Sequence, residues 1–92
     1  MSGDTLDAIR QRFRERALAD ADALSAALKA GDRARIEALA HGLAGAAGIF
    51  GFNEIGGQAK AVDQKFADGG TPSSAQIEAL IASIRRDMNA YS

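Results

Sequence analysis

The sequence predicts an all-α protein that folds as an antiparallel, up-down-up-down four-helix bundle. Apolar residues recur at intervals of three and four along four separate segments, which is the pattern of amphipathic helices facing a common core. No segment shows the alternation of apolar and polar residues that is typical of a strand. The connections between the four segments are short, so neighbouring helices should run antiparallel and bury their apolar faces together.

The first two helices are expected at about residues 4–30 and 32–50. Asp4 or Thr5 can cap the first helix, Gly31 is a natural stop, and Asp32 offers the next N-cap. We assign the apolar stripes of both helices entirely to the core. The first stripe comprises Leu6, Ile9, Phe13, Ala17, Leu24 and Leu28. The second stripe comprises Ile36, Leu39, Ala40, Leu43, Ala47 and Phe50.

The last two helices are expected at about residues 52–68 and 72–91. Near Gly51 the chain either ends the second helix or bends it. Thr71 and Pro72 fit an N-cap followed by the first helical position, and Ser73 with Gln76 is an alternative capping box. The third stripe comprises Phe52, Ile55, Ala59, Val62 and Phe66. The fourth stripe comprises Ile77, Leu80, Ile81, Ile84, Met88 and Tyr91.

Length and composition exclude several classes of protein. Ninety-two residues make a single domain, 1–92, with one core. The chain has no cysteine, and therefore no disulfide or thiolate metal site. A net charge of −1, with both signs mixed, gives no electrostatic reason to expect nucleic-acid binding. The polar N-terminus is unlike a signal peptide and no apolar stretch approaches membrane-spanning length, so we expect a cytoplasmic protein that binds no membrane.

His41 is the only histidine, and it lies in a segment of small residues, AHGLAGAAGIFG. At 100° per residue, it points roughly 170° away from the mean direction of the large apolar residues of its helix. It should therefore face solvent. Its neighbours on that face carry few atoms beyond the backbone, and Glu37 is the only charge among them. These neighbours are Ala34, Glu37, Ala38, Ala44, Gly45 and Gly48.

The glycines of this helix are energetically unfavourable. Each costs about 1 kcal/mol relative to alanine in a helix interior, so Gly42, Gly45 and Gly48 together cost about 3 kcal/mol. A domain of this size is stable by only about 5–14 kcal/mol, which implies a compensating requirement. Gly42 can serve close helix packing. Gly45 and Gly48 instead clear space beside the imidazole for another surface.

The segment as a whole resembles the histidine phosphotransfer (Hpt) domain family. The family pattern is A-H-x-L-K-G-A-A-x-x-x-G, followed by an aliphatic residue four positions later and an acidic residue eight positions beyond that. The resemblance by motif covers about residues 32–66. The positions that match are Ala40, His41, Leu43, Gly45, Ala46, Ala47, Gly51, Ile55 and Asp63.

The resemblance implies a phosphocarrier in a multistep two-component phosphorelay. His41 would accept a phosphoryl group from a receiver-domain phospho-aspartate and pass it to another receiver. The partners implied are response-regulator receivers and a hybrid histidine kinase. Ala38, Ala44, Gly45 and Gly48 would form the docking face. The protein needs no cofactor of its own, because Mg²⁺ belongs to the receiver. We expect a monomer. We also expect no enzyme with independent turnover, since the chain carries no ATP-binding signature.

One position departs from the family pattern. Members usually carry a lysine three residues after the histidine, where this chain has Ala44. Lys60, on the third helix, is a candidate substitute. Asp63 falls at the family's acidic position and could accept the Nδ1 proton of His41, leaving Nε2 as the nucleophile. Lys60 and Asp63 could equally be a solvated pair one helical turn apart.

Two other functions stay open at this stage. Because Ala44 replaces the usual lysine, the protein could be a docking module that uses the same face without being phosphorylated. The Gly/Ala face could also pack against a second copy in a helical dimerisation domain. A metal site is poorly supported, because one histidine without neighbouring ligands is too few. A Ser-His-Asp hydrolase is equally poor, because nothing resembles a nucleophile elbow.

Overall fold

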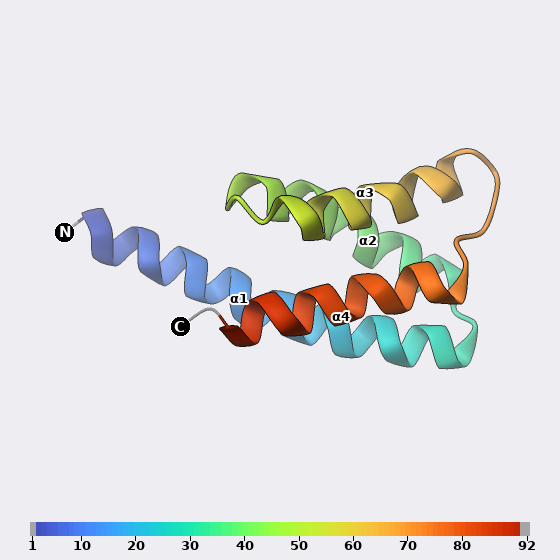
Figure 1. Cartoon of the computed structure of the whole chain (residues 1–92), viewed down its shortest axis with the longest axis horizontal. Helices are drawn as coiled ribbons and strands as arrows, with labels where there is room; N and C mark the ends of the chain where they lie inside the picture. Colours follow the sequence, from blue (N-terminus) through green and yellow to red (C-terminus); the bar gives the residue numbers. More distant parts are fainter. Residues whose placement is uncertain (1, 91–92) are drawn as a thin grey trace.

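The computed structural model describes residues 2–90, and their side chains from Thr5 onward. Four helices account for most of this range, and no strand occurs within it. They are α1 (Ser2–Ala30), α2 (Arg33–Ile49), α3 (Asn53–Ala67) and α4 (Ser74–Ala90). Each helix packs against two neighbours, in the cyclic order α1, α2, α3, α4, and successive helices run antiparallel (Figure 1). The predicted up-down-up-down bundle is therefore confirmed.

The ends of the helices follow local backbone chemistry. Gly31 has a φ of 69°, a left-handed conformation that ends α1 and that glycine adopts without strain. Asp32 then caps α2 as predicted, because its Oδ1 accepts the N–H of Arg35 at 3.1 Å. Gly51, with a φ of 80°, separates α2 from α3, so the second helix ends there rather than bending.

Two of the predicted caps are wrong. The helix α1 begins at Ser2, so Asp4 and Thr5 lie inside its first turns instead of capping it. The last helix begins after Ser73, whose Oγ accepts the N–H of Gln76 at 3.1 Å. The alternative cap at Ser73 is thus correct, and Thr71 with Pro72 belongs to the connection. Pro72 is buried in that connection.

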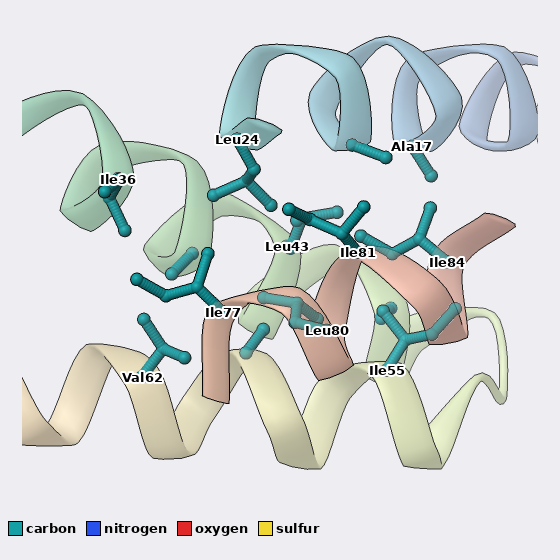
Figure 2. Packing of buried hydrophobic residues seen from close by; sticks show 14 of the residues in the cluster. Ala17, Leu24, Ile36, Leu43, Ile55, Val62, Ile77, Leu80, Ile81 and Ile84 are labelled. Atoms are coloured by element: carbon teal, nitrogen blue, oxygen red, sulfur yellow. The ribbon is translucent and has the colours of Figure 1, made fainter. Parts of the chain in front are cut away.

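The core lies between the four helices and is made of the expected stripes. Figure 2 shows side chains from all four helices pointing into the same space, among them Leu24, Leu43, Ile55 and Leu80. Each large apolar side chain buried in this way contributes about 1.5–3 kcal/mol relative to leaving it in water. The largest fully buried side chains are Leu24, Leu43, Ile55, Val62, Leu80, Ile84 and Met88. Tyr91, the last member of the predicted fourth stripe, lies outside the described residues.

The first turns of α1 depart from the predicted core. They extend past the end of the bundle (Figure 1), and Leu6 and Ile9 are 47% and 43% exposed. The assignment of these two residues to the core is wrong, because no neighbouring helix reaches them. The buried part of the stripe begins at Phe13, which stacks on Phe50 and Phe52 with ring centroids 5.0 and 5.5 Å apart. These three rings close that end of the bundle.

Candidate functional site

The imidazole of His41 stands on the surface of α2, with 79% of its side chain exposed. The buried residues of α2 are Ile36, Ala40, Leu43 and Ala47, while Leu39 and Phe50 are only partly buried. This buried face lies about 130° from His41 around the helix, not the roughly 170° expected. His41 therefore lies at the edge of the exposed face, on the side toward α3.

Asp63 of α3 contacts the imidazole across this edge. Its Oδ2 lies 3.1 Å from Nδ1 of His41, and its side chain is 31% exposed. An ionised carboxylate can only accept a hydrogen bond, so Nδ1 carries a hydrogen and donates a hydrogen bond to Asp63. In the neutral ring Nε2 is then the unprotonated nitrogen, with its lone pair available. The contact fixes both the tautomer and the orientation of the ring.

The surface beside His41 is almost bare. Ala38, Gly45 and Gly48 are exposed, and a Cβ added at either glycine would meet no atom within 4 Å. Ala44 was expected on the same exposed face, but it is partly buried and packs against the core. The exposed part of the predicted docking face therefore consists of Ala38, Gly45 and Gly48, and Ala44 forms its border toward the core.

The two helices that carry the site are in a regular antiparallel register. A Cβ on Gly56 would lie 3.5 Å from the backbone nitrogen of Gly48, so Gly48 and Gly56 are one pair of neighbours across the two helices. His41 and Asp63 form a second pair, seven residues away along each helix. The same register puts Lys60 level with Ala44. Lys60 is exposed and has no hydrogen bond or ion pair with any described residue.

An arginine of α1 that sequence reasoning missed, Arg16, lies against the other side of α2. A Cβ on Gly42 would lie 2.8 Å from Nη2 of Arg16, so this α1 side chain lies over the backbone next to His41. Arg16 also lies 3.6 Å from Asp20. Burial raises the pKa of the Asp20 carboxyl, against the opposing effect of Arg16 and Arg35. The sequence carried no signal for this contact, because the series Arg10, Arg12, Arg14 and Arg16 by its spacing alone indicates a solvated helix face.

Comparison with known families shows to which family the chain belongs. A family model described as the Hpt domain matches residues 8–90, nearly the whole chain. The chain belongs to the Hpt domain family. Hpt domains are phosphocarriers of phosphorelays and are not independent enzymes. They exchange phosphoryl groups with the receiver domains of response regulators. No curated protein and no solved structure matches this Hpt domain.

Two further observations concern the described residues of this Hpt domain. Within the described residues, no group of three or more His, Cys, Asp or Glu side chains is arranged to hold a metal ion. None of the described helices has the length and apolar character that crossing a membrane requires.

Proposed function

We propose that this Hpt domain carries the phosphoryl group on His41, which receives it from the phospho-aspartate of one receiver and passes it to the aspartate of another. The observation that carries the proposal is that His41 is the only histidine in the chain, and therefore in the matched residues 8–90. Its exposure and the bare surface around it support the same assignment, since a carrier must bring its nucleophile to another protein.

The contact with Asp63 supports a simple transfer step. The Nε2 lone pair attacks phosphorus as the bond between phosphorus and the aspartyl oxygen breaks, and the receiver carboxylate leaves with the bonding electrons. No proton needs to move, because Nδ1 keeps its hydrogen throughout. The phosphorylated ring is positively charged, and the Asp63 carboxylate stabilises that charge through the hydrogen bond to Nδ1. Transfer to the second receiver is the reverse of this step.

The partner supplies the remaining chemistry. In-line geometry and Mg²⁺ come with the receiver, so the carrier contributes an accessible ring nitrogen and room for the receiver loops. The face formed by Ala38, Gly45 and Gly48, bordered by Ala44, offers that room. We propose that the domain is a monomer when it meets receivers and that the exchange takes place in the cytoplasm. One source of the donor receiver would be a hybrid histidine kinase.

Lys60 is our candidate for the cation that the family usually places three residues after the histidine. Its position level with Ala44 follows from the register of α2 and α3, and it lies one turn from Asp63 on α3. No described carboxylate neutralises it. Lys60 is thus free to approach a phosphoryl group on His41 from the α3 side.

The decisive experiment is phosphotransfer from isolated phosphorylated receivers to the wild-type chain and to His41→Gln. We expect one phosphate per wild-type chain in an acid-labile, alkali-stable linkage, as in a phosphoramidate, and none on the variant. Helical content and melting temperature should change little, because the substituted side chain is exposed. Glu78→Gln, on an exposed position of α4, is the control that should be labelled normally.

Three results would contradict the assignment in different ways. Labelling of His41→Gln would show that another residue accepts the phosphoryl group. Receiver binding without any labelling of the wild-type chain would favour the non-phosphorylated docking module, which the absence of lysine at Ala44 keeps open. A dimer on a sizing column that is broken by Gly45→Gln would favour the dimerisation module.

A further inference from the structure

The guanidinium of Arg16 is the cation that α1 brings to the neighbourhood of His41. Its Nη2 occupies the space directly over Gly42, where a Cβ would come within 2.8 Å of it. Any other residue at Gly42 would force that guanidinium to shift. The glycine therefore does more than reduce the bulk of α2, because it admits the arginine to the surface beside the imidazole.

Nothing large lies on the surface of α2 between the imidazole and this guanidinium. Gly42 lies 100° around the helix from His41, and Ala38 and Gly45 occupy the arc between them. Ala38 has only a methyl group, and a Cβ at Gly45 would meet nothing within 4 Å. A phosphoryl group on Nε2 would thus face a bare surface, with Asp63 on one side and the arginine on the other.

Arg16 is also available to change partners. Its ion pair with Asp20 is long, at 3.6 Å, and 56% of its side chain is exposed. The Asp20 side chain is only 16% exposed, but a pair of this length constrains the exposed guanidinium weakly. A phosphoryl group offers a doubly charged set of acceptor oxygens that a guanidinium binds through two parallel hydrogen bonds. The exposed guanidinium of Arg16 can therefore exchange the Asp20 carboxylate for a phosphoryl group.

We propose that Arg16 binds the phosphoryl oxygens on His41 from the α1 side, and that Gly42 is the residue that admits it. This inference rests on the proposed phosphorylation of His41. Arg16 is distinct from Lys60, since the two cations belong to different helices on opposite sides of α2. Together they would flank a phosphoryl group that lacks the lysine usual at the position of Ala44.

The test compares three variants in phosphotransfer from a phosphorylated receiver. Arg16→Gln removes the cation. Gly42→Gln retains every charge but fills the space that the guanidinium occupies. Arg10→Gln is the matched control: it removes the same charge from α1, about 120° around the helix from Arg16. Arg10 has no hydrogen bond or ion pair with a described residue. Circular dichroism establishes that each variant is folded.

We expect the transfer rate to fall about tenfold in Arg16→Gln, as for the loss of a hydrogen bond to a charged group. It should fall in Gly42→Gln as well and stay unchanged in Arg10→Gln, and Arg16→Lys should recover part of it. The phosphorus NMR shift of the phosphohistidine should change in Arg16→Gln and Gly42→Gln but not in Arg10→Gln, a response that a merely structural role of Arg16 would not produce.

The failure of this inference differs from failure of the proposed function. If the wild-type chain is never labelled, phosphotransfer through His41 is wrong. If it is labelled and Arg16→Gln transfers phosphate and resonates like Arg10→Gln, only the role of Arg16 is overturned. Normal transfer by Gly42→Gln would likewise overturn it. If Arg16→Gln does not fold, Arg16→Lys and Gly42→Gln decide the question by the same two measurements.

Discussion

At the scale of single residues, the proposed transfer depends on what lies on each side of one imidazole. Asp63 accepts a hydrogen bond from Nδ1, with 3.1 Å between Nδ1 and Oδ2, and Nε2 is left as the unprotonated nitrogen of an exposed side chain. The proposed transfer needs no buried pocket, because the second reactant arrives on another protein. The proposal also requires a cation to meet the phosphoryl charge.

The role of Lys60 is testable with a pair of substitutions. We expect Lys60→Ala to slow phosphotransfer, because it removes positive charge that stabilises the phosphoryl group. Adding Ala44→Lys should restore part of the rate, since Ala44 is level with Lys60 and only partly buried. Rapid-quench measurement of transfer from a labelled receiver gives both rates. Unchanged kinetics in Lys60→Ala would show that it is only a surface residue.

At the scale of the helix, the glycines of α2 and α3 serve different purposes. Gly45 has open space where its side chain would be, whereas a Cβ at Gly56 would already contact the backbone of Gly48 and the Cβ of Ala47, at 3.5 and 3.6 Å. Gly56 thus belongs to the contact between α2 and α3. Gly45 belongs to the outer surface, where its absence of bulk leaves room for the proposed partner and costs helix stability.

Substitutions at these two glycines should therefore have opposite effects on stability. Gly45→Ala should raise the free energy of unfolding by up to about 1 kcal/mol, because it removes a propensity penalty in a helical backbone. Gly45→Gln should also fold, with an unchanged or higher melting temperature, while receiver binding and phosphotransfer fall sharply. Thermal melts and transfer assays measure the two effects.

Gly56→Gln is the matched comparison for this prediction. It should lower the melting temperature, because the added side chain has to separate α2 from α3. If Gly45→Gln unfolds the domain, that glycine serves an interhelix contact after all. If it folds and transfers phosphate normally, the bare face is not the docking site.

At the scale of the whole molecule, stability comes from the part of the bundle where all four helices are present. The described chain is elongated, 45 by 22 by 18 Å, and the first turns of α1 extend beyond its neighbours (Figure 1). An apolar residue contributes to the core only where another helix lies opposite it. Leu80 of α4 is completely buried, whereas Leu6 is nearly half exposed.

This difference predicts very unequal effects for the same substitution. Leu80→Ala should lower the free energy of unfolding by about 2–5 kcal/mol, through lost burial and the cavity left behind. Leu6→Ala should change it by less than about 0.5 kcal/mol, as at an exposed position. Urea unfolding followed by circular dichroism measures both. A comparable loss in Leu6→Ala would mean that the first turns of α1 pack against something in solution.

The number, type and order of the helices followed from the sequence, because helical periodicity and caps such as Asp32 are local properties of the chain. Exposure of His41 followed for the same reason, since it depends on the phase of one amphipathic helix. Its closeness to Asp63 was expected only through the resemblance to a family, because their spacing along the chain does not determine a contact between helices.

Tertiary structure alone decided the features that depend on where one helix lies against another. The overhang of α1 exposes Leu6 and Ile9 although their spacing matches that of buried residues. The orientation of α2 about its own axis places His41 beside α3 and partly buries Ala44. The approach of Arg16 to Gly42 joins α1 to α2 through the reach of a long side chain. Periodicity specifies which face of a helix is apolar, but only packing determines how far that face is covered and which polar groups meet at its edges.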